Sequence, residues 1–157
     1  THCISSAASD VYKRQYVHVG IAVDDQTVIH ASPRYGVAMQ DVAQFQAEFG
    51  QPDVYRPQVD DVATVIARAK TYLGQPYNAT FYPNGAGLYC SELVEVAFGD
   101  KLPFEPQPLR FHDATHDISA YWQAYYDQLG VAVPVGLPGS NPEAMAKSSQ
   151  LTFLGSL

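Results

Sequence analysis

One cysteine carries the residue type and sequence setting of a possible nucleophile. Cys90 stands in the stretch GLYCSELVEVAF, where a glycine-rich loop runs into a predicted helix. The first turn of a helix has backbone N–H groups without partners, and these groups favour a thiolate and can bind an oxyanion. Most free cysteines are buried and inert, however, so this stretch alone leaves both interpretations open.

Two histidines could supply the base that such a cysteine needs. His18 and His30 lie in the predicted strands YVHVGIAV and TVIHAS, which the turn residues DDQ connect. If residues 24–26 form the loop, Gly20 pairs with His30 and His18 with Ser32, so the two histidines are diagonal neighbours on one face. A turn centred on a single residue also brings them together, whereas a turn centred between two residues would separate them.

Two chemistries can be built from this set. In the first, one imidazole takes the proton of Cys90 and the other imidazole orients it. In the second, Cys90, His18 and His30 bind zinc and leave a fourth position for water. The sequence lacks the local metal spacings CxxC and HExxH, which favours the first chemistry and leaves the second open. We therefore predict no cofactor and no metal.

The elements that must position these residues are short. Strands alternate in hydrophobicity and are β-branched, and helices begin at acidic cap residues such as Asp41 and Asp117. The predicted strands cover 16–23, 27–32, 37–40 and 53–57, and the predicted helices cover 41–49, 60–74, 90–98, 117–130 and a short segment near 142–147. The stretch 76–82 is predicted to be extended, and the remaining tail is predicted to be loop. A block of strands with helices around it indicates an α+β domain with an antiparallel sheet.

Composition restricts the partners. The chain has 157 residues, 46% of them hydrophobic and 16% charged, with a net charge of -7. This length fits one domain with a substantial core. The chain has no run rich in Lys and Arg, so nucleic-acid binding is not expected. No apolar run approaches the ~20 residues of a membrane span. The oligomeric state is not indicated.

The first fifteen residues, THCISSAASDVYKRQ, show no convincing period and resemble a translated sequencing adapter. We predict that residues 1–15 are a non-native or disordered leader and that residues 16–157 form a single domain whose natural start is missing. A genuine N-terminal arm is the alternative. Without Cys3, Cys90 is the only cysteine of this domain, so a disulfide within it is impossible. The localisation stays open between a bacterial cell envelope or periplasm and the cytoplasm.

Three stretches in a fixed order carry a family resemblance. HVGIAVDDQTVIHAS, LGQPYNATF and YCSELVEVAF resemble the permuted papain-like thiol hydrolases. This superfamily includes the NlpC-type cell-wall endopeptidases, the lecithin:retinol acyltransferase group and the bacterial YiiX-type proteins. The tail YWQAYYDQLGVAVPVGLPGSNP is most similar to the YiiX-type members, so the resemblance covers about residues 16–150. The strand that precedes the HxGI strand in this family is absent if residues 1–15 are foreign.

The resemblance implies a circularly permuted papain-like, NlpC-type fold and a catalytic triad. Cys90 would be the nucleophile, His18 the general base and His30 the residue that orients His18. The activity would be hydrolysis or transfer at an amide or ester through a thioester, on a peptide amide or a lipid acyl group. YiiX-type members often carry glutamate at the third position, and the acyltransferase group carries histidine. A neutral His30 would stabilise an imidazolium less than a carboxylate would.

Further residues flank the cysteine. Tyr77 and Asn78 could line a substrate cleft, and Tyr89 could place its hydroxyl near the oxyanion, although ordinary packing is the simpler explanation for all three. Glu92 could form a salt bridge or a capping contact at the start of the Cys90 helix. A catalytically inactive binding domain with the same fold is a further alternative.

Overall fold

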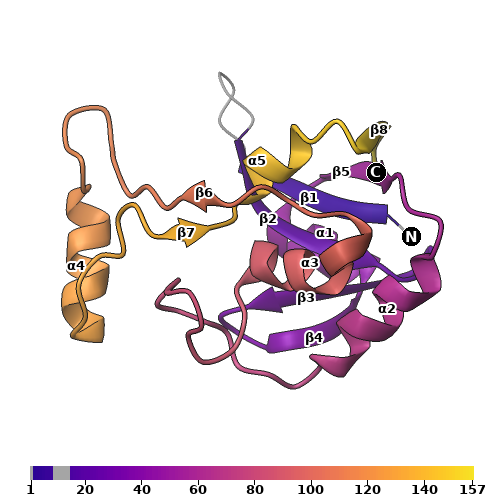
Figure 1. Cartoon of the computed structure of the whole chain (residues 1–157), viewed down its shortest axis with the longest axis horizontal. Coiled ribbons are helices and arrows are strands. Elements are labelled where there is room, and N and C mark those ends of the chain that lie inside the picture. Colours follow the sequence, from indigo (N-terminus) through magenta and orange to yellow (C-terminus); the bar gives the residue numbers. More distant parts are fainter. Residues whose placement is uncertain (1, 9–14) are drawn as a thin grey trace.

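A six-stranded antiparallel sheet forms the centre of the fold (Figure 1). The computed structural model describes residues 2–8 and 15–157. The strands lie side by side in the order β4-β3-β2-β1-β5-β8. Their bounds are β1 His2–Ala8, β2 Gln15–Ala22, β3 Thr27–Ser32, β4 Gly36–Asp41, β5 Pro52–Pro57 and β8 Leu151–Ser156. A separate two-stranded ribbon pairs β6 (Gln107–Pro108) with β7 (Pro138–Gly139).

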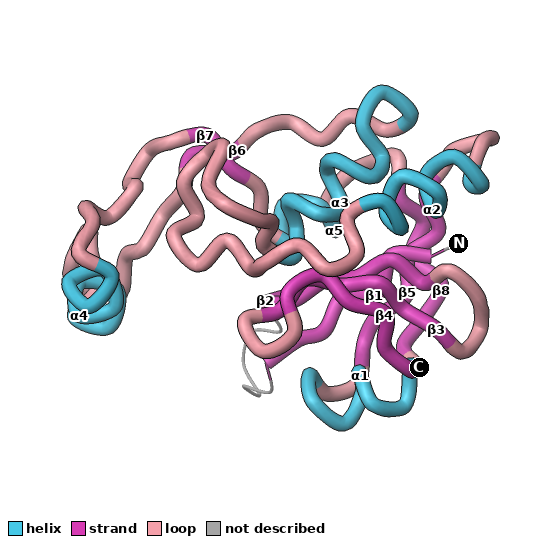
Figure 2. Tube along the Cα trace, turned by 90° about the horizontal axis from the view of Figure 1, so that it is seen from below, coloured by secondary structure: helices cyan, strands magenta, loops and turns pink. Residues whose placement is uncertain are grey.

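Helices cover both faces of this sheet. The helices are α1 Val42–Phe49, α2 Val62–Thr71, α3 Cys90–Phe98, the 3-10 turn η1 Gly99–Lys101, α4 Ala120–Leu129 and α5 Pro142–Ala146. Figure 2 shows α1 on one face of the sheet and α2, α3 and α5 on the other. Helix α4 lies away from the sheet, beyond the β6–β7 ribbon. This arrangement confirms the predicted α+β class with an antiparallel sheet and packed helices.

The β2–β3 hairpin has the predicted register. Gly20 pairs with His30 and Ala22 with Val28, and the Val23 N–H donates to the Thr27 carbonyl across the loop at 2.9 Å. Because side chains alternate along a strand, each face of the hairpin receives every second residue. This register places His18 and His30 on the same face.

Each face of the sheet has its own core. Val19, Ile21 and Ile29 pack with Leu93, Val94, Ala97 and Phe98 of α3, which are all buried as the sequence predicts. On the opposite face, Ala22 and Val28 pack with Phe45, Val42 and Phe49 of α1. The sheet therefore lies between α1 and α3, and each buried side chain of β2 packs toward one of these two helices.

The segment 1–15 differs from the prediction that it lies outside the fold. Residues 2–8 form β1, which pairs with both β2 and β5, and Gln15 begins β2. Residues 1 and 9–14 lie outside the described residues. A strand between two others satisfies the backbone groups of both neighbours, which requires no hydrophobic period in its own sequence. The strand expected to be absent before the HxGI strand is thus present, and the adapter-like origin of these residues stays a prediction.

Pairing with β1 also introduces an irregularity in β2. Ser6 pairs with His18, and Ala7 pairs with Tyr16, so Val17 has no partner in β1, as in a β-bulge. Val17 is exposed, and Tyr16 packs against the α3-side core although His18, two residues away, faces α1. The bulge therefore reverses the alternation just before His18.

Other element boundaries shift for local reasons. Helix α2 begins after the cap residue Asp61, and α4 begins after Ser119 rather than Asp117, because the Ser119 side chain accepts the Trp122 N–H. The stretch 76–82 is irregular rather than a strand. The tail, predicted to be loop, contains β8, which pairs along β5 at the edge of the sheet.

Candidate active site

The two histidines form a directly bonded pair. His18 Nε2 lies 2.9 Å from His30 Nδ1, and the rings meet edge to face with their centroids 5.2 Å apart. His18 is 7% exposed and His30 is fully buried. The sequence prediction that both imidazoles share one face is confirmed, and the structure adds the particular nitrogen atoms that meet.

Aromatic side chains of α1 cover this pair. The His18 ring stacks on Phe49 at a centroid distance of 4.0 Å, and the His30 ring meets Phe45 at 5.2 Å. Burial, followed by repulsion from His30, lowers the pKa of His18 to about 3, and burial also lowers the pKa of His30. Both rings are therefore neutral near neutral pH.

The hydrogen bond between the two neutral imidazoles does not by itself show which histidine is the donor. One nitrogen must donate its N–H and the other must accept it with a lone pair. Since Nε2 of His18 is used in this bond, Nδ1 is the nitrogen of His18 that can exchange a proton with another group. The pair therefore has the connectivity of a base and its orienting partner.

Cys90 is the first residue of α3, at a well-capped helix start. The Tyr89 backbone N–H donates to Glu92 Oε2 at 3.2 Å, which confirms the predicted capping contact of Glu92. The Asn78 amide donates to the same carboxylate oxygen at 3.4 Å. The loop before Cys90 and the helix after it are thus tied together by one side chain.

The helix start lowers the pKa of Cys90 as expected, but burial raises it by more. Burial raises the pKa of the thiol to about 11, although the backbone N–H groups of Val19, Ser91 and Cys90 oppose this shift. The cost of burying a thiolate exceeds the stabilisation that these N–H groups provide. In the free protein the thiol is therefore protonated near neutral pH.

This raised pKa makes a prediction about alkylation. In a Cys3→Ser background, the rate at which iodoacetamide modifies Cys90 should keep increasing up to about pH 11, because only the thiolate reacts. The modification can be followed by intact mass at a series of pH values, with free cysteine as the reference. A rate that levels off below pH 8 would show instead that Cys90 is an activated thiolate.

The thiol and the imidazole pair lie on different sides of β2. Helix α3 packs on one face of the sheet, and the histidine rings contact α1 on the other. The Val19 N–H, which faces the thiol, belongs to the peptide that joins His18 to Val19, just past the last β2–β3 pair at Gly20 and His30. Within residues 15–157, no hydrogen bond joins the Cys90 thiol to either ring. The structure thus brings Cys90 to the backbone beside His18 but not to its ring.

The other predicted site residues have roles within the protein. Tyr77 is partly buried beside Cys90, and burial, together with the charge that the thiolate would carry, raises its pKa. The buried Asn78 amide donates to the Tyr82 carbonyl at 3.0 Å and accepts from Thr80. These bonds occupy the Asn78 amide in holding the loop, whereas Tyr77 lies near enough to Cys90 for a thiolate charge to act on its hydroxyl.

Tyr89 does not present a free hydroxyl. Its oxygen accepts the backbone N–H of Ser140 at 3.1 Å, and the side chain is 4% exposed. This bond anchors the segment before α5 to the start of α3. Packing, the alternative role of Tyr89, is thus what the structure shows, and the backbone N–H groups of Cys90 and Ser91 are the hydrogen-bond donors that act on the thiol.

The loop that delivers Cys90 depends on one glycine. Gly87 has φ +83, and a Cβ atom there would lie 1.9 Å from the Pro76 carbonyl oxygen. Gly87→Ala should therefore destabilise the protein by about 2–4 kcal/mol, since both the backbone and its neighbour must move. Chemical denaturation measures this loss. Gly74→Ala is the matched control, because Gly74 also has a positive φ but open space around it. An equal effect of the two substitutions would contradict the account.

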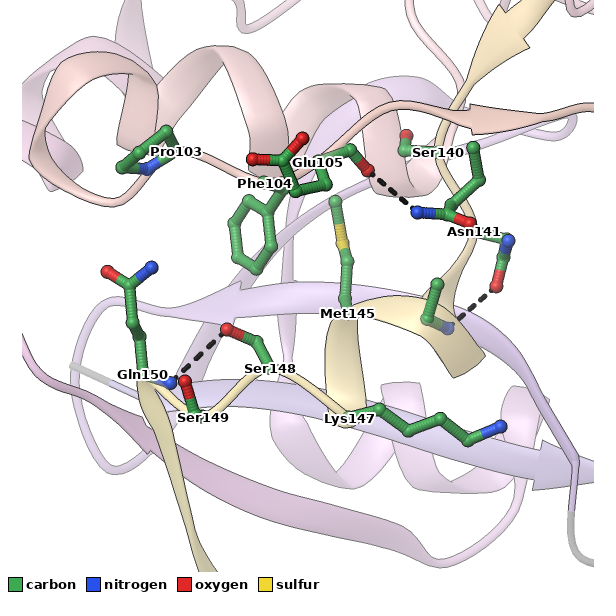
Figure 3. Close-up of a pocket in the computed structure, with 12 residues that line it drawn as sticks. Pro103, Phe104, Glu105, Ser140, Asn141, Met145, Lys147, Ser148, Ser149 and Gln150 are labelled. Atoms are coloured by element: carbon green, nitrogen blue, oxygen red, sulfur yellow. Dashed lines mark hydrogen bonds between the residues drawn. The ribbon is translucent and has the colours of Figure 1, made fainter.

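A cavity of about 320 Å³ was not anticipated from the sequence. It lies between residues 103–107 and the segment that contains α5, and Figure 3 shows Phe104 and Met145 side by side in it, with Glu105 and Lys147 toward its edges. Most of the lining residues are polar, and Phe104 and Met145 contribute large apolar side chains. Ligand cavities commonly combine apolar and polar side chains. Its walls come from two separate stretches that carry no recognisable motif, so no local sequence signal could have indicated it.

Comparison with known proteins now defines the class. Residues 2–155 match the model of the permuted papain-like amidase enzymes of the YaeF/YiiX, C92 family. The chain belongs to this family, and the family is of the cysteine peptidase and amidase type. Comparison with curated protein sequences gives no match.

A solved structure has the same fold. The metalloprotein YiiX from Escherichia coli O157:H7 is similar to this chain with a TM-score of 0.79 and 22% sequence identity. The similarity covers 99% of this chain and 96% of that protein. The predicted permuted papain-like fold and the resemblance to YiiX-type proteins are therefore confirmed.

The described part of the chain contains neither a metal-binding cluster nor a membrane-spanning helix. No three His, Cys, Asp or Glu side chains within it come together in an arrangement that could hold a metal ion. No helix within it is long and apolar enough to cross a membrane.

Proposed function

We propose that this protein is an amidase in which Cys90 attacks the carbonyl carbon of an amide. The His18–His30 pair, joined at 2.9 Å, is the observation that carries this proposal, because it supplies an oriented base next to the strand segment that faces the thiol. The family to which the chain belongs supports hydrolysis of amides, and hence a peptide amide as the substrate.

The reaction uses a neutral thiol and a neutral imidazole. As sulfur bonds to the carbonyl carbon, Nδ1 of His18 takes the thiol proton, and the N–H groups of Cys90 and Ser91 stabilise the oxyanion. The C–N bond then breaks, and His18 gives its proton to the leaving amine. Water, deprotonated by His18, cleaves the resulting thioester and releases the carboxylic acid, while the sulfur regains a proton.

This order of events follows from the two pKa values. With the pKa of Cys90 raised to about 11 and that of His18 lowered to about 3, a preformed thiolate–imidazolium pair is strongly disfavoured. Proton transfer must then accompany attack on the substrate. The proposal also requires the thiol and the His18 ring, which lie on different sides of β2, to approach each other when the substrate binds, as catalytic contacts often do.

A substrate panel tests the reaction class. The protein, with Cys90→Ser as control, is assayed against fluorogenic peptide amides and against matched acyl esters of lipid-like chain length. We expect turnover of peptide amides that Cys90→Ser lacks. Turnover of the acyl esters alone would replace the amidase by an acyl hydrolase or acyltransferase, an alternative that histidine at position 30 favours. No turnover in either series would favour an inactive binding domain.

A mononuclear zinc hydrolase is the second candidate. It is favoured by the description of the similar YiiX structure as a metalloprotein. The residues of this chain do not fit such a site, because His18 Nε2 and His30 Nδ1 bond to each other rather than facing a common metal position, and no three potential ligands come together among the described residues. Metal analysis of protein purified without added metal decides between the two, since one zinc ion per chain would contradict the triad.

A further inference from the structure

Two further polar residues, Gln40 and Glu48, lie next to the histidine pair on the α1 face of the sheet. In the β3–β4 ladder His30 pairs with Ala38 and Val28 with Gln40, so His30 and Gln40 are diagonal neighbours on the α1 face of the sheet. Glu48, near the end of α1, accepts a hydrogen bond from Gln40 Nε2 at 3.0 Å. The order of polar side chains on this face is therefore His18, His30, Gln40, Glu48.

Glu48 determines how the Gln40 amide is turned. A carboxylate can only accept hydrogen bonds, so the nitrogen of the Gln40 amide must face it. Glu48 Oε1 also accepts from the Tyr35 hydroxyl at 3.0 Å and lies 3.9 Å from Arg34 Nη1, which keeps the carboxylate in place. The oxygen of the Gln40 amide consequently points away from Glu48.

That oxygen is available to His30. Gln40 Oε1 and His30 Nε2 are both buried, and neither has a hydrogen-bond partner among the described residues. Gln40 also opposes the lowering of the pKa of His30, the effect expected of an oxygen that faces the ring. Two buried polar atoms without partners on neighbouring side chains are satisfied most directly by each other. Because an amide oxygen only accepts, this bond requires His30 to carry its proton on Nε2, which leaves Nδ1 with a lone pair.

The tautomer of His30 then determines the donor and the acceptor in the hydrogen bond between His18 and His30. His30 Nδ1 accepts, so His18 must donate from Nε2, and Nδ1 of His18 keeps its lone pair. We propose that Gln40 and Glu48 are positioning residues that set the tautomers of both histidines and so keep Nδ1 of His18 able to accept a proton. The consequence for catalysis rests on the proposed amidase function, whereas the tautomers themselves do not.

Nitrogen NMR tests the tautomers without any substrate. Long-range 1H–15N spectra of the protein labelled at histidine distinguish the two neutral forms of each ring. We expect both His18 and His30 to carry the proton on Nε2. In Glu48→Gln the Gln40 amide can turn round, so a substantial Nδ1–H population should appear at both rings. Asp60→Asn, which removes an exposed carboxylate elsewhere, should leave the spectra unchanged.

An exchange of the two side chains provides the rescue. In Gln40→Glu with Glu48→Gln, the carboxylate stands next to His30 and can only accept, so the Nε2–H forms should return. Nδ1–H in the unmodified protein, or a spectrum of Glu48→Gln that matches the unmodified protein, would overturn the proposal. Failure of the exchange to restore Nε2–H in a folded protein would also overturn it.

Kinetics separate this proposal from the function on which it depends. On a peptide amide that the protein hydrolyses, Glu48→Gln should lower kcat by about 10- to 100-fold with little change in KM, and the exchange should recover most of the loss. If the tautomers change as expected while kcat does not, the tautomer assignment stands and the role of His18 as the base fails.

Discussion

Replacing Cys90 with alanine should reduce amide hydrolysis by at least about 10³-fold, because no other group of the site can form the thioester. His18→Ala should cause a loss of similar size, since the thiol is protonated near neutral pH and needs a base. His30→Ala should cost less, because it removes only the partner of His18 Nε2. The kcat/KM values of the three variants on one peptide amide measure this order.

The relative losses of kcat/KM in the three variants are informative only if each variant folds. Circular dichroism and thermal unfolding must show that each variant folds, since all three side chains are buried. His112→Gln, a substitution of an exposed histidine outside the site, is the control and should retain full activity. Activity in Cys90→Ala comparable with that of the control would contradict the assignment of the nucleophile.

The free energy of unfolding should fall steeply as the pH drops below about 6.5. The pKa of His18 is lowered from 6.5 to about 3 in the folded protein, so the unfolded chain binds a proton first as the pH falls through this range. Each such histidine costs about 1.4 kcal/mol per pH unit within the range, and His30 shifts in the same direction. Above pH 6.5 the pair contributes no slope.

Urea titrations at several pH values between 4 and 8 measure this dependence. His18→Leu should flatten the slope, because one of the two buried imidazoles is removed, whereas His112→Gln should leave it unchanged. Equal slopes in the two variants would show that protonation of the histidine pair does not drive acid unfolding.

The parts of the fold that could be predicted from the sequence depend on local patterns. The hairpin register follows from the even separation of His18 and His30 and the three-residue turn, and the inward face of α3 follows from the spacing of Leu93, Val94, Ala97 and Phe98. Asp41 caps α1 as predicted because its side chain accepts the Ala43 N–H. In each case, neighbouring residues alone determine the structure.

The missed features depend on distant partners. Strands β1 and β8 form because β2 and β5 offer them backbone groups, and neither sequence shows the pattern that indicates a strand. The alternation of side chains along β2 predicts that His18 and His30 share a face of the sheet. It does not predict that α3, with Cys90, covers the opposite face. The sequence also left open whether the helix start or burial determines the pKa of Cys90, and burial has the larger effect.

The most direct test of the central claim is to look for the acyl-enzyme. The protein is mixed with a peptide amide that it hydrolyses, quenched with acid during turnover, digested and analysed by mass spectrometry. The account predicts the mass of the acyl group on the peptide that contains Cys90, and none in Cys90→Ser. Continued turnover with no acyl group on Cys90, together with full activity of Cys90→Ala, would contradict it.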